Sequence, residues 1–159
     1  MSERPAPAPT ADVRTPTAEP RSPTAEPHRH RRTRKDHATE VAEDYVEAIA
    51  ELIRHRGECR VSHLAERFSV SHVTVTRTVG RLVRDGLAET EPRAPITLTP
   101  TGAELAAACR ERHAAVLRFL LALGVPEAVA QVDAEGIEHH VSPETLAAMR
   151  GFAAAAAVK

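Results

Sequence analysis

Residues 61–99 decide the fold class, and they read VSHLAERFSVSHVTVTRTVGRLVRDGLAETEPRAPITLT. Apolar spacing predicts a short helix over 61–68 and a second helix that begins near Ser71, its N-cap, and ends at Gly86. Extended segments at 87–91 and 96–99 predict a hairpin, although Pro92 and Pro95 restrict its ladder. Two helices around a tight turn, followed at once by a hairpin, are typical of a winged helix-turn-helix.

The pattern on both sides of this block is helical. An apolar stripe from Val41 to Ile53 predicts a helix from about Thr39 to Gly57. Further helices are expected over about 101–123, 126–141 and 143–154. Residues 1–38 are rich in Pro and Arg and repeat PTAEP, which predicts disorder. We therefore expect a mainly α protein with an extension (1–38), a winged helix-turn-helix domain (39–100) and a helical domain (101–155).

Composition narrows the class of protein. The chain has 159 residues, a net charge of −1 and only 3% aromatic residues, so its core is built from aliphatic side chains and we expect it to depend on a partner chain. No apolar run is long enough to span a bilayer, and no signal peptide precedes the helices, which predicts a cytoplasmic protein with no membrane partner. Two cysteines make no disulfide framework.

The second helix of the helix-turn-helix has a polar face suited to DNA. Thr76 can hydrogen-bond base edges together with Ser71 or His72, and arginines can reach guanines or phosphates. The hairpin tip would add a contact to the DNA backbone. The predicted DNA-binding residues are Ser71, His72, Thr76, Arg77, Arg81, Arg84 and Arg93. The alternative is an ordinary solvated helix face, and the hairpin that follows favours the DNA-binding interpretation.

Acidic residues and histidines recur at the spacing of metal ligands. Glu135, Glu138 and His139 stand at i, i+3 and i+4, on one helical face. Asp44 and Glu47 share a face of the first helix in the same way. Either set alone could be an ordinary solvated helix face.

His113, on the long helix, would add a second imidazole to these four carboxylates. Gathered carboxylates repel one another unless cations are present, and two divalent ions would cancel four negative charges. Oxygen-rich ligation with two imidazoles suits Mn²⁺ or Fe²⁺, with Zn²⁺ also open. Cys109 could add a sulfur ligand or simply fill the core, and His140 points away from the Glu135 face, as expected of a supporting or packing residue.

The sequence resembles the manganese transport regulator (MntR) family, within the diphtheria-toxin-repressor-like metal-dependent regulators. The resemblance runs from about Glu43 to Phe152 and is carried by EDYVEAIAELI, by the helix-turn-helix block, by RERHAAVLRFLLALGV and by DAEGIEHHVS. It places the family's six ligand positions on Asp44, Glu47, His113, Glu135, Glu138 and His139, which fit the manganese branch. It implies a homodimer in which Mn(II), two ions per subunit, enables operator binding and represses manganese-uptake genes.

Other classes of function remain as alternatives. One is a metal-independent winged-helix regulator, in which the acids are merely solvated. Another is a di-metal carboxylate enzyme in a helical bundle. Since no activated nucleophile or phosphate loop is present, we expect no enzyme and no small-molecule substrate. In two places the chain departs from the family: the wing reads EPRAPITLT without the expected glycine, and the extension has no counterpart.

Overall fold

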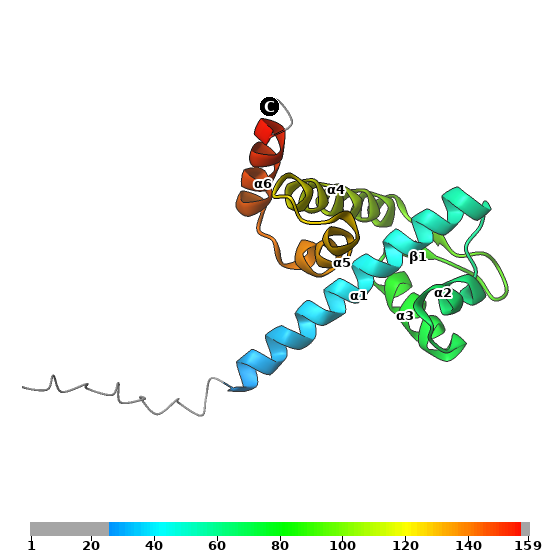
Figure 1. The fold of residues 1–159 in the computed structure, drawn as a ribbon. Coiled ribbons are helices and arrows are strands. Elements are labelled where there is room, and N and C mark those ends of the chain that lie inside the picture. The colour runs from blue at the N-terminus through cyan, green and yellow to red at the C-terminus, as the bar shows by residue number, and fades with distance from the viewer. Residues whose placement is uncertain (1–25, 157–159) are drawn as a thin grey trace, which may run out of the picture.

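The structure is a computed structural model that describes residues 26–156, with side chains from residue 37 on. Its elements follow the order expected for a winged helix-turn-helix with a helical domain after it (Figure 1). They are α1 (Glu26–Arg56), α2 (Val61–Phe68), α3 (His72–Arg84), β1 (Ala88–Glu89), β2 (Thr97–Leu98), α4 (Pro100–Ala122), α5 (Glu127–Ile137), the short 3₁₀ helix η1 (Glu138–His140) and α6 (Pro143–Ala156). The mainly helical fold class is confirmed.

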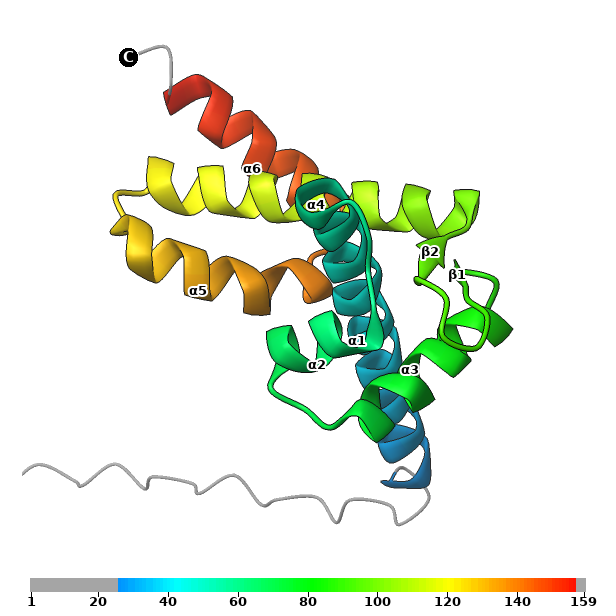
Figure 2. The same cartoon turned by 90° about the vertical axis from the view of Figure 1, so that its right-hand side faces the viewer.

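Helix α1 joins two hydrophobic cores. It contacts α2, α3, β2 and α4, and in Figure 2 it crosses between the helix-turn-helix and the α4–α6 group. The first core is built on the apolar stripe of α1, where Tyr45, Val46 and Ile49 are buried against α2, α3 and β2. The second core lies among α4, α5 and α6, around Val116 and Leu120. A change in how α1 meets α4 therefore moves one core relative to the other.

Local signals set most helix boundaries. The side chain of Ser71 accepts a hydrogen bond from the amide of Thr74 at 3.2 Å, and that of Thr99 accepts one from Gly102 at 3.0 Å, so both residues are N-caps. Ser142 does the same for Thr145, ahead of Pro143 in α6. Gly57, just after α1, has φ +79°, the left-handed conformation that favours glycine at a helix end. The predicted N-cap at Ser71 and the predicted helix end at Gly57 are confirmed, and α4 and α6 begin within one residue of their predicted starts.

The start of α1 differs from the prediction. The helix begins at Glu26 rather than at Thr39, so the prediction of disorder is wrong for residues 26–38. Pro27 lies in the first turn, where a missing amide donor breaks no helical hydrogen bond, and the Arg and Lys residues that follow have good helix propensity. Residues 1–25 lie outside the described part of the chain, so disorder in this segment stays a prediction.

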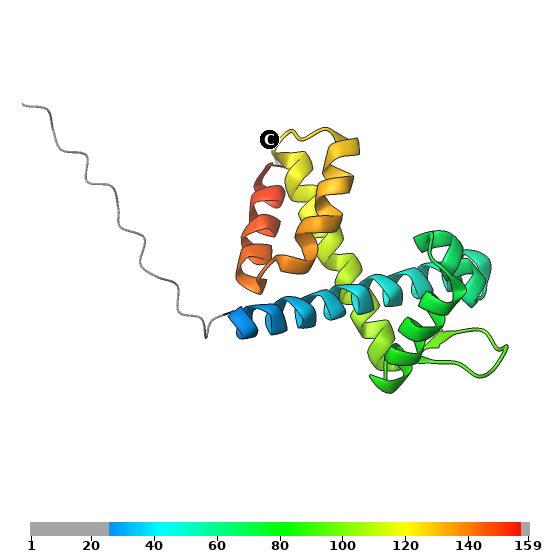
Figure 3. The same cartoon turned by 90° about the horizontal axis from the view of Figure 1, so that it is seen from below.

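The hairpin is shorter than predicted. Its two antiparallel pairs are Ala88 with Leu98 and Glu89 with Thr97, since Pro92 and Pro95 cannot donate to a longer ladder. A bridge between Cys59 and Ile96 ties the hairpin to the segment after α1. At its tip Arg93 adopts φ +69°, the conformation that a glycine would otherwise provide. Figure 3 shows this loop projecting away from the helices.

Candidate metal centre and DNA-reading face

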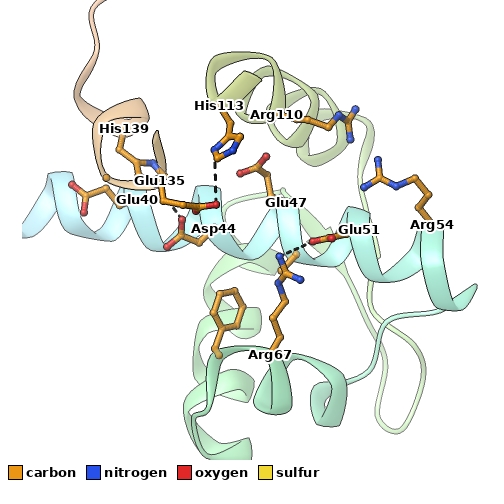
Figure 4. A pocket seen from close by; sticks show the side chains of 13 residues that line it. Glu40, Asp44, Glu47, Glu51, Arg54, Arg67, Arg110, His113, Glu135 and His139 are labelled. Carbon is orange, nitrogen blue, oxygen red and sulfur yellow. Dashed lines mark ion pairs between the residues drawn. The ribbon is translucent and has the colours of Figure 1, made fainter. Parts of the chain in front are cut away.

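A cavity of about 640 Å³ lies between α1, α2, α4 and α5–η1 (Figure 4). Five of the six predicted ligands line it, and α1, α4 and α5–η1 each contribute at least one. These five are Asp44, Glu47, His113, Glu135 and His139. The sixth, Glu138, lies behind His113 and is only 2% exposed, whereas the side chain of Glu135 is 72% exposed. The candidate site is thus closed at Glu138 and open to solvent at Glu135.

Close contacts join the predicted ligands across these elements. His113 Nδ1 lies 2.8 Å from Glu138 Oε2 and 3.8 Å from Glu135 Oε1. His139 Nε2 lies 3.2 Å from Asp44 Oδ1 and 3.8 Å from Glu138 Oε1. Imidazole nitrogens therefore separate the carboxylates of α1 and η1, which would otherwise face one another.

The arrangement suits divalent cations by its chemistry. Four carboxylates and two imidazoles form a donor set of hard oxygen and borderline nitrogen atoms. Among residues 37–156, whose side chains the structure describes, no three His, Cys, Asp or Glu side chains already surround a single point as a metal-binding cluster. Five of the six donors contact one another instead, so a cation would have to replace these contacts.

The electrostatics of the cavity favour extra protons. Burial, with the charge of Glu138 next, raises the pKa of Glu47 from 4.5 to about 7. Burial also raises the pKa of Asp44 and of Glu138. For His139 burial lowers the pKa, but the hydrogen bond to Glu43 and the charges of Asp44, Glu138 and Glu43 together outweigh it, so the net shift is upward. All four groups hold protons more tightly than in an unfolded chain.

This uptake of protons predicts that the metal-free protein loses stability as the pH rises. Between pH 4.5 and about 7 the folded state binds the Glu47 proton and the unfolded state does not, so unfolding becomes easier with increasing pH. Calorimetric melting of the metal-free protein across this window checks the slope. A Glu47→Gln variant should flatten it, and an unchanged slope in that variant would contradict the assignment. Saturating metal should reverse the trend, because ligands must lose protons to bind.

Sequence reasoning missed two residues of this region, Glu43 and Arg112. Each adjoins a predicted ligand in sequence, about 100° further around its helix. Only the packing of α1 on α4 brings Glu43 and Arg112 together, at 2.6 Å. Cys109 is buried and receives a hydrogen bond from Arg112 at 3.4 Å, so its thiol does not line the cavity. His140 is largely exposed and lies 3.5 Å from Glu40, so it does not support the ligands.

The predicted DNA-reading residues share one exposed surface. In α3 the side chains of Val75, Val79 and Leu82 are buried, which turns the opposite face to solvent. The seven predicted residues, Ser71, His72, Thr76, Arg77, Arg81, Arg84 and Arg93, are all exposed. A groove of about 550 Å³ separates α3 from the hairpin, lined by Thr76 and Gly80 on one side and Arg93 on the other. The Thr76 hydroxyl donates to the His72 carbonyl, which fixes its orientation.

Comparison with known families assigns the fold. The model of the iron dependent repressor N-terminal DNA binding domain matches residues 37–95, and that of the iron dependent repressor metal binding and dimerisation domain matches residues 99–155. The chain therefore belongs to the iron-dependent repressor family. It is a metal-dependent transcriptional repressor and not an enzyme, and its domains serve DNA binding, divalent-metal binding and dimerisation.

Individual relatives refine this picture. The chain is 48% identical over 122 residues to the transcriptional regulator MntR of Escherichia coli O6:H1, across 77% of this chain and 79% of that protein. It is 42% identical over 100 residues to the regulator MntR of Lysinibacillus sphaericus, across 63% and 72%. A solved manganese-dependent transcriptional repressor in complex with manganese matches with a TM-score of 0.64 and 29% identity, over 71% of this chain and 52% of that one. This chain thus spans about half the length of that solved protein.

No helix among the described residues is both long and apolar enough to cross a membrane.

Proposed function

We propose that this protein is a manganese-responsive homodimeric repressor that binds its operator when Mn(II) is bound. Two ions per subunit would be held by Asp44, Glu47, His113, Glu135, Glu138 and His139, and the regulated genes would be those of manganese uptake. The observation that carries the proposal is that five of these residues line one cavity, while the sixth, Glu138, lies 2.8 Å from His113.

The donor set supports manganese over softer metals. All six groups offer carboxylate oxygen or imidazole nitrogen, and the nearby thiol of Cys109 is occupied by Arg112 outside the cavity lining. Mn²⁺ accepts such ligands readily, whereas thiolates favour Zn²⁺ and copper. The names of the MntR relatives point the same way. Fe(II) and other divalent ions remain competitors to be tested.

The position of α1 supplies the link to DNA. Asp44 and Glu47 project from the same helix that packs on α3, while the other four ligands belong to the helical domain. Bound cations would neutralise the facing carboxylates and hold α1 against α4 and η1. In a dimer this restriction would set two α3 helices about 34 Å apart, one turn of DNA.

Operator binding with and without metal tests the proposal. An operator can be selected from random duplexes with the purified full-length protein and MnCl₂, then labelled for fluorescence anisotropy at fixed salt. We expect Mn²⁺ to raise operator affinity about 100-fold or more, with a weaker effect of Mg²⁺. Equal affinity with and without Mn²⁺ would identify a metal-independent regulator. Sedimentation should show a dimer in the complex.

Arg77, on the exposed face of α3, should contribute directly to operator binding. Replacing Arg77 by alanine removes a contact to a base or phosphate, for which a loss of about 5- to 150-fold in operator affinity is expected. Metal binding should stay unchanged. Arg56→Ala is the matched control, since Arg56 carries the same charge at the end of α1 and pairs with Glu66. If both variants lost the same operator affinity, the loss in Arg77→Ala would reflect only the change in net charge and not a contact with DNA.

A further inference from the structure

Behind the predicted ligands lies a buried ion pair. Glu43 of α1 is almost completely buried, and its Oε2 accepts a hydrogen bond from Arg112 Nη2 of α4 at 2.6 Å. The same oxygen lies 2.8 Å from Nδ1 of His139 in η1. Glu43 does not line the cavity, although its neighbour Asp44 does. The Glu43 carboxylate thus links α1 to α4 and to η1 without facing the cavity.

This contact determines which nitrogen of His139 faces the cavity. An ionised carboxylate can only accept, so Nδ1 must donate its hydrogen to Glu43. In the neutral ring the lone pair then lies on Nε2, which points to Asp44 Oδ1 at 3.2 Å. A ring held in this way offers Nε2 to a cation without a change of tautomer.

Arg112 stabilises the buried carboxylate of Glu43. Its guanidinium supplies the opposite charge that a buried carboxylate needs, and it is steadied by a further hydrogen bond to Cys109. Its Nε is buried without a hydrogen-bond partner. An apolar pair would fill the same space without that unsatisfied donor, which argues that the ion pair is kept for a purpose other than packing.

We infer that Glu43, held by Arg112, is a positioning residue that fixes His139 as an Nε2 metal ligand. The inference rests on the proposed function, since it assigns a role toward the same metal site. The carboxylate orients the ring, selects its tautomer and makes Nε2 a stronger donor. Glu43 acts through His139 and does not itself touch the metal.

Metal affinity of Glu43 variants tests this role. Free Mn²⁺ is measured by electron paramagnetic resonance with the full-length protein. Glu43→Leu removes the acceptor and should weaken Mn²⁺ binding about 10- to 100-fold, the range for groups that support metal-bound histidines. Glu43→Gln keeps an acceptor without the charge and should fall between. Glu111→Gln, on the exposed side of α4, is the matched control and should bind as the wild type does.

A double variant separates positioning from stability. Glu43→Leu with Arg112→Met replaces the ion pair by an apolar pair and should restore the melting temperature lost in Glu43→Leu, but not the Mn²⁺ affinity. Affinity that returns together with stability would overturn the inference, as would Mn²⁺ binding by Glu43→Leu within twofold of the control.

The tautomer of His139 gives a readout that needs no metal. In the metal-free wild type, at a pH high enough for the His139 ring to be neutral, ¹⁵N spectra of the histidine rings should show a protonated Nδ1 and an unprotonated Nε2 for this residue, identified by its loss in His139→Gln. Glu43→Leu should shift the ring toward the other tautomer, and an unchanged spectrum would overturn the inference. If the proposed function itself is wrong, wild-type protein fails to bind Mn²⁺, which is a different result from normal wild-type binding with insensitive Glu43 variants.

Discussion

Glu138→Gln is expected to abolish the metal response of operator binding while making the metal-free protein more stable. Glu138 is the most deeply buried of the six candidate ligands, and its Oε2 is 2.8 Å from His113 Nδ1. Glutamine keeps the shape but lacks the charge that a cation needs. Mn²⁺ affinity should fall about 100-fold or more, because even residues that only support ligands cost up to that much.

The gain in stability comes from the same charge. Burial raises the pKa of Glu138, so its ionised form is unfavourable in the metal-free fold. A neutral glutamine removes this cost at any pH above the raised pKa of Glu138, where the wild type carries the charge. Thermal melting of the metal-free variant should show the higher stability, and Mn²⁺ titration of the same sample should show the weaker metal binding. Glu127→Gln, in the first turn of α5, is the control, and a Glu138→Gln variant that both unfolds easily and loses metal would indicate a purely structural role.

Gly102→Ala should destabilise the fold strongly, although alanine is normally the better helix former. A Cβ added at Gly102 would lie 1.8 Å from the carbonyl oxygen of Leu87, an impossible approach to backbone. That carbonyl already accepts a hydrogen bond from Thr99, so the hairpin and the start of α4 cannot easily separate. We expect a loss of about 3 kcal/mol in the free energy of unfolding, the upper range for overpacking.

The control for this prediction has the opposite sign. A Cβ at Gly151 in α6 would meet no atom within 4 Å, so Gly151→Ala should stabilise by up to about 1 kcal/mol. Urea unfolding at one protein concentration compares both variants with the wild type. Similar stability of the two variants would show that the contact between Leu87 and Gly102 relaxes at little cost.

Much of the fold follows from local signals in the sequence. The N-caps Ser71, Thr99 and Ser142 and the glycine after α1 act within a few residues of their position, so spacing predicts them. The start of α1 was not predicted because the apolar stripe begins only at Val41, and the residues before it carry no periodic apolar signal. The bridge between Cys59 and Ile96 joins distant segments and has no local signal.

The sequence predicts which residue types make up the candidate site, but not how deeply each of them is buried. Helical spacing gathers Glu135, Glu138 and His139 on one face, yet it cannot tell that Glu138 is buried while Glu135 is exposed. That difference depends on the end of α5, where the chain tightens into η1 and turns Glu138 toward His113. Glu43 and Arg112 acquire their roles only through the packing of α1 on α4.

The two cysteines have a consequence for how oxidants act on this regulator. Cys59 and Cys109 are both fully buried, and burial raises their pKa values to about 11 and about 12. At neutral pH about one in ten thousand Cys59 thiols, and about a tenth as many Cys109 thiols, is then a thiolate, the form that peroxides and alkylating agents attack. Oxidants and alkylating agents are therefore expected to react slowly with both cysteines while the protein stays folded.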